Sequence, residues 1–421
     1  MRINRLLLST VLSVLLCFSL FTSVKAETMM WSKTFQEIMG YSVIEATDGG
    51  YALAGTTGNN CWLVKTDAAG NVEWNQTYGG GGFRSLVATS DNGYALAGTT
   101  NPYGFDAGEI WLVKTDSLGN IEWNKTYGES GYIEGRSLVA TSDGGYAFAA
   151  FTDSLGAGGL DIWLVKTDTD GNMEWNKTYG GIENDAAFSL VETSDGGYAM
   201  AGAHGSTHLA NYDIFGHFLG GDCWAAKTDS LGNMEWNKTY VESGYIEVRS
   251  LIEASDGGYA IAGTTAYSFG SDAEGYNFGL IKTDSLGNME WNRTYGGTGA
   301  DYGHFLVETS DGGYAIAGTR DCSFILISRG TSWLVKTDSL GNMEWNKTYA
   351  EENAHWTCSL IAASDGGYAM ASYAYLENNP GFVLIKTDEF GVVPEAAWVI
   401  LPLLLIATFS VFISKKKLRQ F

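Results

Sequence analysis

Apolar and polar residues alternate along the chain in short runs that return about every fifty residues, a period typical of repeat folds. In one copy the runs occupy residues 137–141, 146–151, 162–168 and 173–179. Alternation with a period of two predicts β-strands. Asp143-Gly144-Gly145 follows the first run, and such Asp-Gly pairs are typical of tight hairpin turns. Each copy therefore predicts four antiparallel strands.

The fourth run of each copy, a Met-Glu-Trp-Asn-Lys-Thr-Tyr segment, is the most regular part of the repeat. Its copies start at Met30, Val72, Ile121, Met173, Met234, Met289 and Met343. Seven copies of a four-stranded unit predict a seven-bladed β-propeller. The chain also has 55 glycines, 23 tyrosines and 14 tryptophans but only four prolines, which favours short strands and tight turns. The predicted fold class is therefore all-β, with four-stranded antiparallel blades.

The two ends of the repeat region are out of phase with each other. The chain enters the repeats at Trp31 with a fourth strand and leaves them with a third strand at residues 381–388. The N-terminal strand can therefore complete the seventh blade. This closure leaves no free sheet edge between the first and last blades.

Tryptophan, lysine and tyrosine alternate with glutamate, asparagine and threonine along each fourth strand. Successive side chains of a strand point to opposite faces. We therefore expect the tryptophans to pack in the core between blades. Lysines such as Lys166 and Lys177 are predicted to lie between blades, opposite the glutamates.

The formal net charge is −23, from 48 acidic and 25 basic residues. A surface this acidic repels phosphate backbones, so nucleic-acid binding is not expected. Such a surface favours cations or neutral ligands as partners instead.

Both termini have the composition of targeting segments. Arg2 and Arg5 precede an apolar run that ends at Val24-Lys25-Ala26, which predicts a signal peptide over residues 1–26. Residues 396–413 form a second apolar run, followed by a basic cluster, which predicts one transmembrane helix with a cytoplasmic tail. The predicted domains are thus the signal peptide, a propeller ectodomain at 27–390 and an anchor at 391–421. We expect an exported, monomeric ectodomain held at the cell surface.

The repeat carries Asp-Gly-Gly-Tyr, Ala-Gly-Thr, Val-Lys-Thr-Asp and Gly-Asn-x-x-Trp signatures from about Trp31 to Asp388. In these it resembles archaeal and bacterial cell-surface β-propeller repeat proteins, and this resemblance implies display at the surface. Val393-Pro394-Glu395, the apolar run and the basic end also resemble archaeal PEF-type sorting signals, with Ala396 where those signals usually have phenylalanine. That resemblance implies processing by a membrane-bound sorting protease.

In an up-and-down blade, the first–second and third–fourth turns lie on one rim, here called the constant rim because its turns hardly vary. The other connections lie on the opposite, variable rim, which includes the long loops at 203–222 and 264–277. Binding sites commonly occupy variable loops over a rigid scaffold.

One position of the first strand changes from copy to copy while its neighbours hardly do, and it is predicted to ring the channel mouth. Its residues are Tyr41, Arg84, Arg136, Phe188, Arg249, His304 and Cys358. Arg84, Arg136, Arg249 and His304 are the predicted ligand-binding residues, because converging arginines can hold a carboxylate or acidic sugar. In the alternative interpretation each arginine pairs with a carboxylate such as Glu134 or Glu247 and only caps its blade.

His204, His208 and His217 lie within fourteen residues of one another, near Asp213 and Asp222. They are a weak candidate for a metal site. Their spacing matches no zinc signature, so no metal and no cofactor are predicted.

Cys322 and Cys358 fall in neighbouring blades on the variable rim and are the candidate disulfide of this exported chain. The fourth strands also carry Asn-x-Thr, the glycosylation acceptor pattern. The six candidate acceptors are Asn75, Asn124, Asn176, Asn237, Asn292 and Asn346.

No nucleophile elbow, phosphate-binding loop or His-Glu-x-x-His helix occurs in the sequence. We therefore predict a non-enzymatic binding or adhesion protein that recognises a glycan, a protein or a small anionic ligand. The alternatives are a structural surface coat or a propeller enzyme, either a quinone-dependent dehydrogenase or a polysaccharide-active enzyme.

Overall fold

The computed structural model describes residues 31–393, apart from gaps at 37–38, 58–59, 101–107, 129–130, 207–221, 241–244, 267–275, 298, 323–329, 350–354 and 377–378. The predicted signal peptide and C-terminal anchor lie outside the described residues. Within the described part, the regular structure is entirely β, and no helix is long and apolar enough to cross a membrane.

Twenty-eight strands form seven sheets of four. The first strands of the blades are β2 (Met39–Glu45), β6 (Gly82–Ala88), β10 (Ile133–Ala140), β14 (Asn184–Glu192), β18 (Tyr245–Glu253), β22 (Ala300–Glu308) and β26 (His355–Ala362). The second strands are β3 (Tyr51–Thr57), β7 (Tyr94–Thr99), β11 (Tyr146–Thr152), β15 (Tyr198–Ser206), β19 (Tyr259–Ala266), β23 (Tyr314–Cys322) and β27 (Tyr368–Leu376). The third strands are β4 (Asn60–Thr66), β8 (Ile110–Thr115), β12 (Asp161–Thr167), β16 (Asp222–Thr228), β20 (Tyr276–Thr283), β24 (Thr331–Thr337) and β28 (Asn379–Thr387). The fourth strands are β5 (Val72–Tyr78), β9 (Ile121–Tyr127), β13 (Met173–Tyr179), β17 (Met234–Tyr240), β21 (Met289–Tyr295), β25 (Met343–Tyr349) and β1 (Trp31–Gln36).

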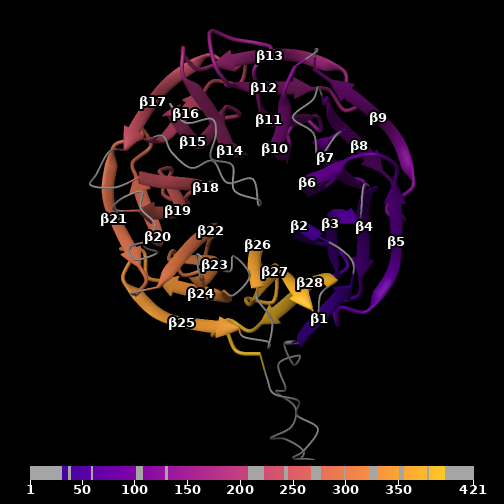
Figure 1. Ribbon diagram of the computed structural model, residues 1–421, viewed down its shortest axis with the longest axis vertical. Helices are drawn as coiled ribbons and strands as arrows, with labels where there is room; N and C mark the ends of the chain where they lie inside the picture. Colours follow the sequence, from indigo (N-terminus) through magenta and orange to yellow (C-terminus); the bar gives the residue numbers. More distant parts are fainter. Residues whose placement is uncertain are drawn as a thin grey trace, which may run out of the picture.

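The sheets stand as blades around a central axis, with the first strands innermost and the fourth strands on the outer circumference (Figure 1). Blade 7 combines the last three strands of the repeat region with β1, in the order β1-β28-β27-β26. β1 pairs antiparallel with β28, from Trp31 opposite Lys386 to Gln36 opposite Gly381. The predicted seven-bladed propeller and its closure by the N-terminal strand are both confirmed.

The hydrophobic core lies between blades, because each sheet is buried on both faces. Between blades 1 and 2, for example, Leu63 and Tyr78 of the first blade cluster with Phe83 and Leu96 of the second. A similar cluster joins blades 7 and 1, where Phe382 packs with residues of β3 and β4. The closure junction is therefore packed like the internal ones.

Each innermost strand contains a β-bulge about halfway along. In β10 the pairing with β11 passes from Gly135 directly to Ser137, which leaves Arg136 outside the ladder. The same shift occurs in all seven innermost strands. A bulge inserts one unpaired residue and re-aims its side chain. The bulge interrupts the alternation of side chains, so the sequence pattern predicts only the part of β10 that follows it. The strand itself begins at Ile133, four residues before the predicted start.

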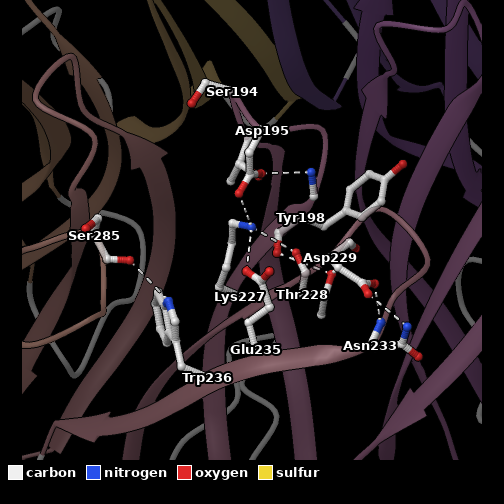
Figure 2. Close-up of polar contacts among 12 residues, drawn as sticks. Ser194, Asp195, Tyr198, Lys227, Thr228, Asp229, Asn233, Glu235, Trp236 and Ser285 are labelled. Carbon is white, nitrogen blue, oxygen red and sulfur yellow. Dashed lines mark hydrogen bonds and ion pairs between the residues drawn. The ribbon is translucent and has the colours of Figure 1, made fainter.

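The constant rim repeats one set of polar contacts in blade after blade. In blade 4, Lys227 of β16 lies 2.8 Å from Asp195 of the first–second turn and 2.9 Å from Glu235 of β17 (Figure 2). Lys166 makes the equivalent pairs within blade 3, with Asp143 and Glu174. The predicted pairing of Lys166 with a fourth-strand glutamate is confirmed, and the glutamate belongs to its own blade. Adjacent strands of one sheet bring the third-strand lysine next to the glutamate of its own blade.

Fourth strands contact the next blade through their tyrosines and tryptophans. The hydroxyl of Tyr240 donates to the carbonyl oxygen of Gly287 in the next blade at 2.9 Å, and five other junctions repeat this bond. Gly287 has φ +73°, and the Trp236 ring of blade 4 packs against it. At the closure junction Phe35 replaces tyrosine and cannot make the bond. Trp31 still donates to the Ala68 carbonyl there, at 2.9 Å.

Candidate ligand site at the channel mouth

The bulge residues are the seven variable residues singled out in the sequence. They are Tyr41, Arg84, Arg136, Phe188, Arg249, His304 and Cys358. A residue outside the hydrogen-bonded ladder has no cross-strand partner, so its side chain is free of the pairing constraints of its neighbours. This explains how one position varies within a strand that otherwise stays constant.

Each of the three arginines pairs with a carboxylate, as the alternative interpretation predicts, and two of them share one. Arg136 and Arg84, from neighbouring blades, lie 3.1 Å and 3.4 Å from the same oxygen of Glu134. Arg249 pairs with Glu247 of its own strand. Arg136 is 8 % exposed and Arg84 is 25 % exposed, so Arg84 offers more of its guanidinium to the channel. Three positive charges thus face two carboxylates, in a protein of net charge −23.

Glu134 is the centre of this arginine cluster. Burial raises the pKa of its carboxyl group, but the charges of Arg136 and Arg84 and a hydrogen bond from Tyr132 outweigh burial and lower it. The Tyr132 hydroxyl donates to Glu134 Oε2 at 2.8 Å. The charge of Arg249 also acts on Glu134. The carboxylate is therefore ionised at neutral pH, and its charge interacts with all three arginines.

Aromatic rings support the guanidinium groups. Arg84 lies over Tyr41 of blade 1, 4.6 Å from the ring centroid. Arg136 and Arg249 lie 5.4 Å and 5.3 Å from the ring of Phe188, which is the bulge residue between them in blade order. Cation–π contact favours a charged group without using its N–H donors. The arrangement thus holds the guanidiniums in place.

His304 belongs to a different cluster from the arginines. It is 5 % exposed, and its ring centroid lies 4.7 Å from that of Trp356 in blade 7. Trp356 in turn packs against Tyr302. His304 therefore contributes to packing between blades 6 and 7, and the site considered below consists of the arginine cluster without it.

Of the three candidate metal-binding histidines, only His204 is among the described residues. Its Nδ1 lies 2.5 Å from Asp185, and its ring stacks on Trp224. His208 and His217 lie outside the described residues. In the described part of the chain, no three His, Cys, Asp or Glu side chains are grouped to hold a metal ion.

Cys358 carries a free thiol, which donates to the Trp356 carbonyl at 3.2 Å. The side chain of Cys322 lies outside the described residues, so a disulfide between the two stays a prediction. Burial raises the pKa of the Cys358 thiol to about 12. The thiol is therefore protonated at neutral pH and has little nucleophilic character.

The glycosylation candidates lie on the outermost strands. Three of them, Asn124, Asn176 and Asn346, accept a hydrogen bond from a tryptophan Nε1 of the third strand of the same blade, at 3.1–3.2 Å. Their modification stays a prediction.

Sequence reasoning found the arginines and both glutamates but missed Tyr132. The signal was present, because Tyr132, Glu134 and Arg136 are spaced by two and so fall on one face of an extended strand. The sharing of Glu134 between two blades had no sequence signal, because it depends on how neighbouring bulges face each other.

No family model matches the chain, and no curated protein matches it. Among solved structures, the Pan2 WD40 domain of Neurospora crassa aligns with a TM-score of 0.51 and 9 % identity over 84 % of this chain and 91 % of that one. An α-L-arabinanase of Penicillium chrysogenum aligns with a TM-score of 0.47 and 13 % identity over 72 % and 92 %. At such identities the likeness to Pan2 establishes the β-propeller fold alone, and the arabinanase adds no functional argument.

Proposed function

We propose that this chain is a non-enzymatic binding propeller that captures an anionic ligand, a carboxylate or an acidic sugar, at the mouth of its channel. The supporting observation is the arginine cluster. Arg84 and Arg136 share Glu134 and Arg249 pairs with Glu247, which leaves an excess of positive charge on the innermost strands of an otherwise acidic molecule. Such a focus attracts anions, which the acidic remainder of the protein repels.

A ligand carboxylate would compete with Glu134 for Arg84, the most exposed of the three arginines. Bidentate hydrogen bonds from guanidinium to carboxylate are strong and directional. Tyr41 and Tyr132 add an aromatic face and a hydroxyl next to the charges. These groups suit a sugar acid, which has a carboxylate, hydroxyls and an apolar ring face.

The test uses uronic-acid oligosaccharides and their neutral, carboxyl-reduced counterparts, with binding measured by titration calorimetry. The acidic sugars should bind and the neutral ones should not. In the variant with Arg84, Arg136 and Arg249 all changed to alanine, binding should be lost. Each arginine is expected to contribute about tenfold or more in affinity, because a hydrogen bond to a charged group is worth roughly 1.5–3 kcal/mol.

Two controls separate loss of the site from loss of the fold. Arg293→Ala removes an exposed arginine of β21, which stacks on Trp291 of its own strand, and should leave binding unchanged. A second variant adds Glu134→Gln and Glu247→Gln to the three arginine changes, so that no buried carboxylate is left without a partner. If this variant keeps the parent's near-ultraviolet circular dichroism and binds the acidic sugars as well as the parent, the proposed site is wrong.

The proposal also places the propeller outside the cell, anchored through residues 391–421. The signal-like residues 1–26 and the apolar run at 396–413 support this placement.

A further inference from the structure

The exposed large apolar side chains gather on one rim. Of twelve such side chains in the described residues, nine stand in the third–fourth turns or at the first residue of a fourth strand, and Phe390 and Val392 stand in the equivalent turn after β28, all on the constant rim. Only Ile182 stands elsewhere, on the variable rim. The most prominent are the turn tips, which are 59–63 % exposed: Leu118, Leu231, Leu286, Leu340 and Phe390.

These tips are unevenly spread around the ring. Blades 4 to 7 each carry a leucine or phenylalanine at the tip, whereas blades 1 and 3 carry Ala69 and Asp170. We call the tips of blades 4 to 7 the apolar arc: Leu231, Leu286, Leu340 and Phe390. Exposed apolar side chains on four successive blades of one rim mark an interaction site more often than residues scattered over the surface do.

The turns do not need these side chains for their own structure. The turn of blade 5 is held by Asp284, whose carboxylate accepts from the backbone N–H groups of Leu286 and Asn288 and from the Asn288 amide, all at 2.8–2.9 Å. The blade 3 turn has the same bonds with Asp170 at the tip. A leucine at the tip therefore adds exposed apolar surface without adding a contact that forms the turn.

A lysine of the preceding blade reaches two of these turns. Lys177 lies 3.4 Å from Asn233 in the blade 4 turn, and Lys238 lies 3.2 Å from Asn288 in the blade 5 turn. The buried lysines of the same rim each pair with an aspartate and a glutamate of their own blade in blades 4 to 6, so the rim around the arc keeps an excess of negative charge. It suits a partner that offers an apolar layer and carries no net negative charge.

The chain leaves the propeller at the blade 7 end of this arc. The last described residue, Val393, follows Phe390 by three residues. The predicted membrane span begins at Ala396, and three residues reach at most about 10 Å. A span starting so close to the fold leaves the constant rim little room to stand away from the bilayer.

We infer that the apolar arc rests in the interfacial layer of the membrane and holds the variable rim facing outward. The partner is a bilayer of zwitterionic lipid, because a chain of net charge −23 is repelled by anionic headgroups. Leucine and phenylalanine on turn tips are side chains that insert at the boundary of headgroups and acyl chains. The inference rests on the proposed anchoring and is independent of the proposed ligand.

The test places a fluorescent label on the full chain in phosphatidylcholine vesicles that contain headgroup nitroxide lipids. The label is attached to Leu286→Cys or, as the matched control, to the exposed Ile182→Cys on the variable rim. In both chains Cys17, Cys322 and Cys358 are changed to serine, while Cys61 and Cys223 are buried and do not react. The label at 286 should be quenched severalfold more than the label at 182. Changing Leu231 and Leu340 to serine should reduce that quenching.

The outcomes separate this inference from the anchoring on which it rests. If the chain is washed off the vesicles at alkaline pH, the anchoring fails and the inference fails with it. If the chain stays bound but both labels are quenched equally, the inference alone is overturned. If the label at 286 is not quenched by the nitroxide lipids but is shielded from a water-soluble quencher, a second copy covers the arc and the membrane contact is wrong.

Discussion

On the constant rim, seven buried lysines each face an aspartate of their own blade, whereas at the bulges of the innermost strands two arginines of neighbouring blades share one glutamate and a third arginine pairs with another. Each lysine and its aspartate belong to the same repeat, so duplication of the repeat duplicates the whole ion pair. The arginine cluster is complete only across several repeats. It therefore depends on which blades are neighbours.

The bulge explains why one blade supports both arrangements. The ladder residues on either side of it are fixed by pairing and by contacts with the next blade, as where Leu251 N–H donates to Ser189 Oγ at 3.0 Å. The bulge residue takes no part in the ladder pairing. Variation is therefore concentrated at a position where it costs the sheet little.

The largest expected effect is on a constant-rim glycine. Gly287→Ala introduces a side chain at φ +73°, where its Cβ would lie 2.7 Å from the Trp236 ring. Gly257→Ala in the same blade has a similar φ of +81° but nothing within 4 Å. Denaturant unfolding should show a loss of about 3 kcal/mol for the first, from strain plus overpacking, and about 1 kcal/mol for the second, from strain alone. Equal losses would contradict the role given to the tryptophan contact.

A lysine pair should give the next largest effect, with a pH dependence. Hydrogen bonds from Lys227 and Thr193 lower the pKa of Asp195 from 3.8 to about 2. Because the folded-state pKa is depressed, this stabilisation is present above pH 4 and is lost as the pH falls toward 2. Lys227→Met should destabilise by about 1–2 kcal/mol at pH 7, since the carboxylates left behind are more than a third exposed and stay hydrated. The cost should shrink between pH 4 and pH 2, and a constant cost across that range would refute the pairing.

The closure junction offers a change in the opposite direction. Tyr240→Phe removes the bond to Gly287 and should cost about 1 kcal/mol, while Phe35→Tyr supplies the missing bond to blade 1 and should add about as much. Thermal unfolding of the two variants beside the parent would measure both. A Phe35→Tyr variant no more stable than the parent would mean that the closure junction differs from the other six in more than this hydroxyl.

The smallest effect is expected at a bulge. Cys358→Ala should change the unfolding free energy by less than about 0.5 kcal/mol, because the residue lies outside the ladder and its thiol makes only a weak hydrogen bond. Its neighbour Ser359 accepts from Val43 N–H of blade 1 at 3.3 Å, so Ser359→Ala should cost about 1 kcal/mol. A larger loss at position 358 than at 359 would show that the bulge is not a neutral position.

The blade, its four strands and the register of closure were predictable because they depend on local alternation and on the phase of the repeat. The set of variable positions was predictable too, by aligning the copies. The pairing of Lys166 with a glutamate was predictable, but the sequence does not show the register shift that leaves Glu174 of the same blade outside the ladder beside this lysine. His304 and the arginines were grouped in the sequence by alignment alone, and the structure separates them by which side chains they pack against.

The sequence by itself determined that this protein is a closed ring of seven four-stranded blades, with one rim constant and the other variable. Side-chain alternation and turn residues are local properties of the sequence, and seven copies of a four-stranded unit predict a propeller. Only the tertiary structure decided that the variable position is a bulge, that Arg84 and Arg136 meet on one glutamate and that His304 is buried. Those features depend on the register between paired strands and on the facing of adjacent blades. These are contacts between residues far apart in the chain, and no local pattern encodes them.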